Sequence, residues 1–165
     1  MTNTWPVQGD CRRFYGAPGT NHTMLDLPYE MTYDGKPVKR ITINKKCADS
    51  AFRALTQISK EYSATDRKAL GLSIFAGCFN NRPMRGGSQP SMHAFACAID
   101  FDAERNQMKW GKEGARLASG KVVNVPRLSL PDCIPFWKAW EAEGWISLGR
   151  TRNFDWMHVQ AARLG

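Results

Sequence analysis

The sequence lacks several features that would place it in familiar structural classes. No two of its five cysteines have Cys-x-x-Cys spacing, which argues against a zinc ribbon or a thioredoxin-like redox motif. No apolar run approaches the ~18 residues of a transmembrane helix. The first residues have neither the basic nor the apolar region of a secretory signal. We therefore expect a chain made in the cytoplasm, with reduced thiols and no membrane span.

Repeats and low-complexity tracts are also missing, and the composition is that of an ordinary soluble protein. Hydrophobic residues make up 42% and charged residues 23% of the 165 positions. This length suits one core, so we expect a single compact domain over 1–165 and a monomer.

Acidic residues are few, because Lys and Arg outnumber Asp and Glu by 23 to 15 and give a net charge of +8. The excess is concentrated between Asp34 and Lys60, where seven basic residues accompany two acidic ones. Such a stretch is either a solvated face or a surface for polyanions such as anionic envelope polymers. No helix with clustered Lys and Arg and no nucleic-acid-binding motif is present, so nucleic acid is not an expected partner.

The apolar pattern predicts an α+β fold with a small antiparallel sheet and helices packed against it. Gly and Pro punctuate residues 1–35, which we expect to form an irregular, wrapping N-terminal segment. The first predicted helix has a stripe of Phe52, Leu55, Ile58 and Tyr62 after a cap at Asp49 or Ser50, and the second a stripe of Phe136, Trp137 and Trp140. The predicted strands are 38–45, 70–79, 95–102, 145–148 and 157–161, and the predicted helices are 49–62 and 131–143.

Histidine is scarce, and two of the three histidines lie close to a carboxylate. His93 precedes Asp100 by seven residues, and His158 follows Asp155 by three. His and Asp are good Zn²⁺ ligands, and three of them leave the fourth tetrahedral position open for water, as catalysis requires. Asp155 can serve as the general base for that water if the chain bends at this point. The spacing alone leaves open that each histidine is simply a hydrogen-bonded structural residue.

Two spaced motifs resemble the peptidase M15 family, which comprises zinc D-Ala-D-Ala carboxypeptidases and dipeptidases and phage L-alanyl-D-glutamate endopeptidases. Ser91-x-His93 followed by Asp100 is similar to the family pattern SxHxxGxAxD. Asp155-x-x-His158 is similar to its later carboxylate-x-x-His, and Arg82 stands upstream. The resemblance extends from about residue 76 to the end, and it implies the Hedgehog-like zinc peptidase fold.

The resemblance also implies roles for individual residues. His93, Asp100 and His158 would bind one Zn²⁺. Asp155 would be the base that activates the attacking water and then protonates the leaving amine. Arg82 would hold the carbonyl oxygen as negative charge develops on it, with Arg85 as the alternative for that role. Ser91 would support a ligand through a hydrogen bond.

Two departures from the family pattern stand out. Ala96 replaces the motif glycine, and we expect its methyl group to narrow the approach to the substrate. Gln160 stands where many relatives have Glu, which we interpret as neutral. Of the other residues, Cys97 and Cys78 are expected in the core rather than on zinc. Trp110 and Trp156 are the aromatic residues expected near the cleft, with Trp156 and Arg85 as candidate substrate contacts. Asp102 and Glu104 are expected in a solvated turn, with Ca²⁺ binding as the alternative.

The expected function is hydrolysis of an amide bond in the stem peptides of peptidoglycan by a bacteriolytic, endolysin-like enzyme. The missing signal favours an L-alanyl-D-glutamate endopeptidase that reaches the wall after a holin opens the membrane. A D-alanyl-D-alanine carboxypeptidase and a non-catalytic zinc-binding module of the same fold are the alternatives.

Overall fold

A long β-hairpin and a separate four-stranded sheet frame the protein in the computed structural model, which describes residues 4–108, 110, 115–123 and 125–165. Helices pack against both, so the predicted α+β class is confirmed. The elements in chain order are η1 (Gln8–Asp10), α1 (Cys11–Tyr15), β1 (His22–Tyr33), β2 (Lys36–Asn44), α2 (Lys45–Glu61), α3 (Ala64–Leu70), β3 (Phe75–Gly77), η2 (Met92–Phe95), β4 (Ala98–Phe101), η3 (Glu104–Asn106), β5 (Ala115–Arg116), β6 (Val122–Val123), η4 (Arg127–Ser129), η5 (Pro131–Cys133), α4 (Ile134–Ala142), β7 (Ile146–Ser147), α5 (Leu148–Arg152) and β8 (His158–Gln160).

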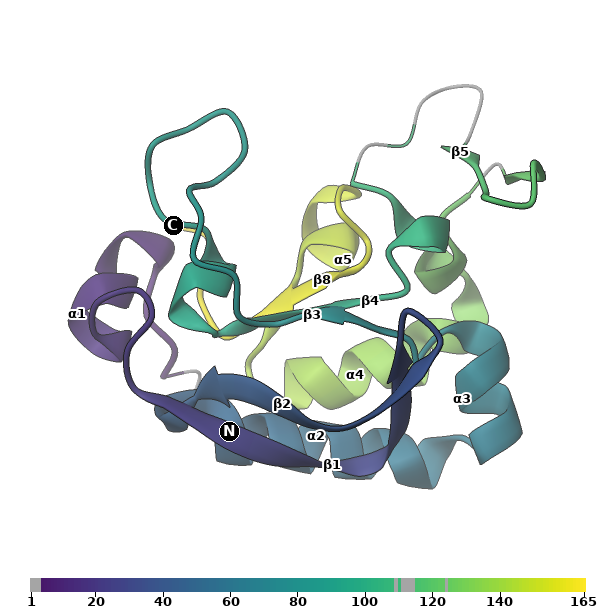
Figure 1. Ribbon diagram of the computed structural model, residues 1–165, viewed down its shortest axis with the longest axis horizontal. Coiled ribbons are helices and arrows are strands. Elements are labelled where there is room, and N and C mark those ends of the chain that lie inside the picture. Colours follow the sequence, from purple (N-terminus) through teal and green to yellow (C-terminus); the bar gives the residue numbers. More distant parts are fainter. Residues whose placement is uncertain (1–3, 109, 111–114, 124) are drawn as a thin grey trace.

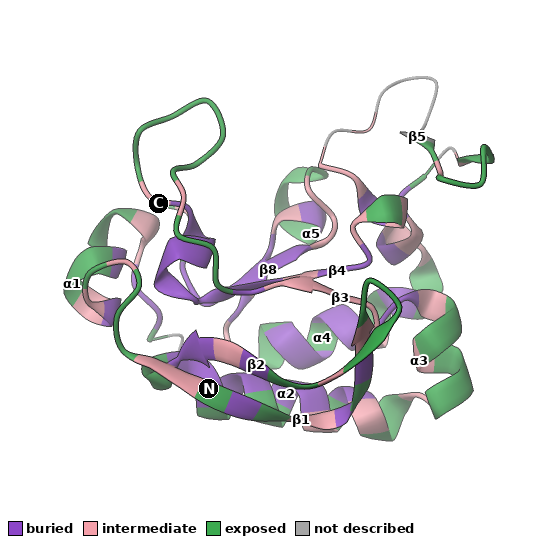
Figure 2. Ribbon diagram, viewed as in Figure 1, coloured by how far each residue is buried: buried purple, intermediate pink, exposed green. Residues whose placement is uncertain are grey.

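Figure 1 shows how these elements are layered. The β1–β2 hairpin and α2 form the lower part of the view, the sheet of β3, β4 and β8 crosses the middle, and α4 lies between them. A long loop that leads into η2 rises from the upper side of the sheet. In Figure 2 the strands β4 and β8 are largely buried, the helix α4 is buried on one side, and the raised loop is exposed. In the described part of the chain, none of the helices is both long and apolar enough to cross a membrane.

The N-terminal segment is more regular than its glycines and prolines predict. Among the described residues before 22, Gln8–Asp10 form η1 and Cys11–Tyr15 form the short helix α1, but residues 22–33 form β1, a strand of 12 residues. The prediction of an irregular segment is therefore wrong for β1. Its pairing with β2 shifts register between Asp26 and Met31, which is where Pro28 breaks the alternation. Proline is tolerated at such irregularities, so it does not end the strand.

The first long helix begins earlier than predicted. The cap of α2 is Asn44, whose side chain accepts a hydrogen bond of 3.0 Å from the Lys46 N–H, and neither Asp49 nor Ser50 has this role. The predicted stripe is also partly wrong, because Phe52 is 43% exposed. Leu55 and Ile58 are buried as expected, but small residues make up the rest of the packed face: Cys47, Ala48, Ser50, Ala51 and Ala54.

The predicted strand 70–79 is mostly not a strand. Leu70 ends α3, Gly71 caps that helix with φ of +84°, and only Phe75–Gly77 pair as β3. The side chain of Asp102 fills the space that a Cβ at position 71 would need, so glycine is required there by packing as well as by φ. Asp102 is itself buried and its carboxylate binds Arg105 at 2.5 Å, so the expected solvated turn is wrong for this residue.

The central sheet has the strand order β3-β4-β8-β7 and is antiparallel throughout, as predicted. Its strands are shorter than the predicted ranges, because residues 92–95 form η2 and only 98–101 form β4. Behind it, the predicted helix 131–143 is present as η5 followed by α4, and Phe136, Trp137 and Trp140 are buried as expected. The Phe136 ring packs edge-on against Phe101 of β4, at 5.1 Å between centroids, and fixes the helix to the sheet.

Candidate metal centre

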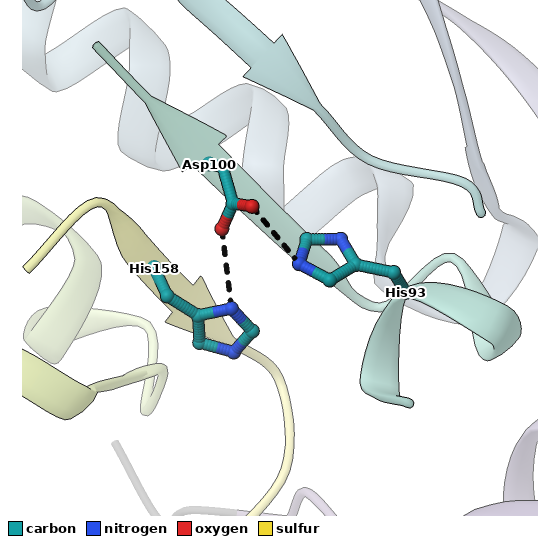
Figure 3. A group of neighbouring side chains, drawn as sticks. All are labelled: His93, Asp100 and His158. Atoms are coloured by element: carbon teal, nitrogen blue, oxygen red, sulfur yellow. Dashed lines mark hydrogen bonds and ion pairs between the residues drawn. The ribbon is translucent and has the colours of Figure 1, made fainter. Parts of the chain in front are cut away.

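Three predicted ligands from distant parts of the chain meet on the upper side of the sheet. Figure 3 shows His93 from η2, Asp100 from β4 and His158 from β8 pointing toward one another. One potential ligand atom from each residue lies within 4.8 Å of the others, and all three side chains are largely buried. These residues could therefore hold a metal ion, as the sequence predicted.

Sheet pairing places two of the ligands. Asp100 on β4 and His158 on β8 are direct partners in the antiparallel register, so their side chains emerge on the same face. Asp100 Oδ1 lies 3.2 Å from His158 Nδ1. Two ligands on one tetrahedral zinc ion are about 3.3 Å apart, given metal–ligand distances of about 2.0–2.1 Å. The register therefore sets a separation that suits such an ion.

A tight turn places the third ligand. The Ser91 side chain caps η2 by accepting a hydrogen bond of 3.2 Å from the His93 N–H. On the other side of the imidazole, Nδ1 lies 2.8 Å from the Cys78 carbonyl oxygen. A carbonyl can only accept, so His93 Nδ1 carries the hydrogen and Nε2 keeps its lone pair. That Nε2 lies 3.2 Å from Asp100 Oδ2. Ser91 thus supports a ligand, as expected.

His158 presents the opposite ring nitrogen. Its Nε2 lies 2.8 Å from the Gln160 side-chain oxygen and donates to it, which leaves the Nδ1 lone pair facing Asp100. Two nitrogen lone pairs and a carboxylate therefore converge with no hydrogen between them when both histidines are neutral. These three groups repel one another, and only a cation between them, either a proton or a metal ion, removes the repulsion. The donor set fits Zn²⁺, and the hydrogen bonds behind both histidines are those that hold metal ligands in place.

The electrostatics of the site favour a bound cation. Burial alone would raise the pKa of Asp100, but hydrogen bonds and charge from His158 and His93 outweigh it and hold that pKa well below its usual value. Burial would likewise lower the pKa of His158, but Asp100 outweighs it and the pKa is raised. Asp100 is therefore a carboxylate at neutral pH, and it supplies the negative charge of the site.

Asp155 lies beside the three ligands, at a bend. Its φ is +53°, and its carbonyl accepts a hydrogen bond of 3.0 Å from the His158 N–H, so the chain turns before β8 begins. This is the bend that a base at this position requires. The carboxylate Oδ2 is 3.9 Å from His158 Nδ1. Burial raises the pKa of Asp155 and the charge of Asp100 adds to that, although His158 opposes it. A raised pKa suits a carboxylate that must take up a proton.

An open pocket of about 320 Å³ gives access to the ligands, and both predicted arginines line it. Arg82 is half-buried, and its positive charge acts on the carboxyl group of Asp155, although less than burial does. Arg85 is exposed. The pocket therefore has a cation close to Asp155 and a second one nearer to solvent.

Trp156 lies beside the metal pocket rather than in its lining. Its indole occupies the space beside the backbone of Gly149, packs on Trp137 at 6.3 Å between centroids, and donates 2.8 Å to Asn153 Oδ1. With Trp110 it lines a neighbouring cavity of about 690 Å³. The two cavities share Met108, Phe154 and Asp155. Both tryptophans therefore lie next to the metal pocket, and a contact between Trp156 and substrate stays a prediction.

The expectation for Ala96 is also wrong in its reasoning. Ala96 is fully buried in the core, so its methyl group does not narrow the approach to the substrate. The residue instead has left-handed backbone angles, with φ of +55°, and ends η2. Glycine adopts that conformation without strain, which explains why a glycine fits this place in the motif. Cys97 and Cys78 are buried and unpaired, as expected, and Cys78 contributes its carbonyl rather than its thiol.

Gln8 is a site residue that the sequence did not single out, and Gln160 was noted only as a departure from the family pattern. The side-chain oxygen of Gln160 contacts His158 directly, so Gln160 has a place in the site that the sequence analysis did not assign to it. The signal was present, because residues two apart on a strand share a face. Gln8 lines the metal pocket from the N-terminal segment and bonds to Gln160. Comparison of the chain with protein-family models, with curated proteins and with solved structures gave no match.

Proposed function

We propose that the protein is a zinc metallopeptidase that hydrolyses an amide bond in peptidoglycan stem peptides, as an endolysin-like L-alanyl-D-glutamate endopeptidase. One observation carries the proposal: the lone pairs of His93, Asp100 and His158 converge in an open pocket beside a half-buried carboxylate, Asp155. Three protein ligands of this kind are typical of catalytic rather than structural zinc. The substrate class comes from the resemblance to the peptidase M15 family.

In the proposed reaction, Asp155 transfers a proton and Arg82 stabilises negative charge. When bound, zinc polarises the scissile carbonyl and lowers the pKa of water at the open coordination position to ~7. Asp155 accepts a proton from the attacking water and passes it to the leaving amine. Its raised pKa favours holding that proton between the two steps. Arg82 stabilises the negative charge that develops on the carbonyl oxygen.

A D-alanyl-D-alanine carboxypeptidase is the second candidate, and Arg85 is the observation that favours it. A carboxypeptidase needs a cation for the terminal carboxylate of its substrate, beyond the one that serves the oxyanion. Arg85 supplies such a cation at the exposed side of the pocket. In an endopeptidase the same guanidinium would bind a carboxylate further along the stem peptide.

The basic residues between Asp34 and Lys60 support a role at the anionic bacterial envelope. Arg40 is paired with Asp26 and Arg53 with Glu143, so these two cations are partly neutralised. Lys36, Lys39 and Lys45 are exposed. We include attraction to anionic wall polymers in the proposal, and adsorption should weaken as salt is raised.

Mass spectrometry of purified peptidoglycan after digestion tests the proposal. New N-terminal D-Glu supports the endopeptidase, and released D-Ala supports the carboxypeptidase. An unchanged digest, from protein with one zinc per chain, would overturn both and leave the non-catalytic zinc-binding module. The Asp155→Asn variant serves as the inactive control, because the substitution removes the base and retains the three metal ligands.

A further inference from the structure

A buried chain of hydrogen bonds leads from His158 to the N-terminal segment. His158 and Gln160 are two residues apart on β8, so their side chains lie on the same face of the strand. Both are at least 95% buried, and His158 Nε2 lies 2.8 Å from Gln160 Oε1. The Gln160 amide nitrogen continues the chain, with contacts to Gln8 Oε1 at 2.9 Å and to the Ala162 carbonyl at 3.0 Å.

These contacts determine which nitrogen of His158 carries the hydrogen. The Ala162 carbonyl can only accept, so the Gln160 atom that faces it must be the amide nitrogen. The Gln160 oxygen then faces His158, and an oxygen of this kind also only accepts. His158 must therefore donate from Nε2, which leaves the lone pair on Nδ1. The Ala162 carbonyl, four residues beyond His158, thus determines the tautomer of that histidine through Gln160.

Gln8 holds the Gln160 amide in that orientation. Its Oε1 accepts the second amide hydrogen, so both hydrogens of Gln160 are used and rotation of the amide would break all three contacts. Gln8 is fixed in turn by the main chain, since its N–H donates 2.8 Å to the Arg163 carbonyl. The N-terminal and C-terminal segments, 152 residues apart at Gln8 and Gln160, are joined behind the metal ligand.

From this geometry we infer that Gln160 is a positioning residue that fixes the metal-binding tautomer of His158, and that Gln8 locks Gln160 in place. The inference rests on the metal-binding part of the proposed function and is independent of the substrate. It makes the N-terminal segment part of the metal site. Outer hydrogen-bond partners of metal ligands typically change metal affinity about 10- to 100-fold when lost.

Zinc affinity, measured by competition with a chelator, shows how much each hydrogen bond behind His158 contributes to metal binding. Gln160→Leu should weaken zinc binding about 10- to 100-fold. Gln160→Glu keeps an acceptor for His158 and should bind zinc within about threefold of wild type or more tightly. Gln8→Leu removes one neutral hydrogen bond from the chain and should weaken binding about two- to tenfold. Gln57→Leu, the same substitution at an exposed position of α2, is the matched control and should change nothing.

Long-range ¹H–¹⁵N NMR of the metal-free protein, recorded at a pH high enough that His158 is neutral, reads the tautomer directly. Wild type should show His158 protonated at Nε2, and Gln160→Leu should show a mixture of the two tautomers. A wild-type His158 protonated at Nδ1, or Gln160→Leu with wild-type zinc affinity, would overturn the inference. The wild-type spectrum suffices even if Gln160→Leu fails to fold. If wild type binds no zinc, the proposed function fails, and the NMR result still decides the tautomer.

Discussion

Asp100 and His158 are direct partners across an antiparallel strand pair, and their side chains meet at 3.2 Å although 58 residues separate them in sequence. One backbone register therefore sets the spacing of two metal ligands. A shift of one residue in β8 would turn His158 to the opposite face. The candidate metal site therefore depends on the sheet register more than on any local motif.

Removal of metal should destabilise the protein. Zinc at about 1,000 times its Kd should add about 4 kcal/mol to the free energy of unfolding. For a chain of this size that raises Tm by roughly 8–16 °C. Differential scanning fluorimetry with zinc and with a chelator measures the shift, and metal analysis should find one zinc per chain.

Variants of single histidines show which residues the zinc-dependent rise in Tm requires. His158→Ala should lose the zinc-dependent shift. His22→Gln should keep it, because His22 lies outside the site and packs on Phe79 at 4.4 Å between ring centroids. An equal shift in all three proteins would place the zinc elsewhere.

Replacement of Asp155 should separate catalysis from metal binding. Asp155→Asn keeps the side-chain shape but cannot take a proton, so the hydrolysis rate should fall about 10²- to 10⁴-fold. Zinc content should stay at one per chain, because the ligand set is intact. Asp26→Asn removes an exposed carboxylate far from the pocket and should retain full activity. If Asp155→Asn hydrolyses the wall at the wild-type rate, another group is the base.

The two arginines of the pocket should differ in their kinetic effects. Arg82→Met should lower kcat by about 10²-fold or more, because the guanidinium stabilises charge that exists only in the transition state. Arg85→Met should raise KM and leave kcat nearly unchanged, because its contact is made with the bound substrate. Steady-state kinetics on a purified muropeptide measures both. The opposite pattern would transfer the oxyanion role to Arg85.

Local patterns predicted the features that depend on neighbouring residues. The helix 131–143 is present, because a proline suits its first turn and its apolar stripe identifies the buried face. The strand β1 was missed because Pro28 interrupts its alternation, and only pairing with β2 shows that the strand continues. The start of α2 was missed because Ala-rich helical faces give a weak apolar signal.

The candidate metal ligands could be predicted, since histidine is rare in this chain and the spacing of the three residues resembles a known motif. Gln8 could not be predicted, because nothing near it in the sequence indicates a partner 152 residues away. The packing of Trp156 could not be predicted either, because it depends on the space left beside Gly149 in α5. The roles that could not be predicted from the sequence are therefore those that depend on tertiary contacts.

Stability should depend on pH through Glu143. Burial opposes ionisation of this carboxyl group and raises its pKa. Hydrogen bonds of 2.8 Å from Arg53 and from Ser50 outweigh burial, so the pKa of Glu143 is lowered. A lowered pKa in the folded state means that stabilisation is present above the unfolded pKa and is lost as pH falls through the folded value.

The Glu143→Gln variant isolates that contribution. It should cost about 1 kcal/mol at pH 7, because the Arg53 side of the pair is exposed to solvent. The difference from wild type should vanish once wild-type Glu143 is protonated at low pH. Urea unfolding at both pH values measures it, and a difference that is equal at pH 7 and pH 3 would contradict the assignment.

The backbone of Ala96 should contain strain that glycine relieves. A left-handed conformation costs an alanine about 1–2 kcal/mol. Ala96→Gly removes that cost, but it also loses a buried methyl worth about 0.8 kcal/mol and increases the entropy of the unfolded chain. The net change in the free energy of unfolding should therefore be within about 1 kcal/mol of zero.

Ala98 is the matched comparison, because it is equally buried but lies in the extended strand β4. Ala98→Gly loses the same methyl and gains the same unfolded-state entropy with no strain to relieve, so it should cost about 1.5–2 kcal/mol. The difference between the two variants in urea unfolding is then the strain at position 96. Equal destabilisation would show that Ala96 is unstrained. Hydrolysis by Ala96→Gly should match wild type, because its methyl lies in the core and not in the pocket.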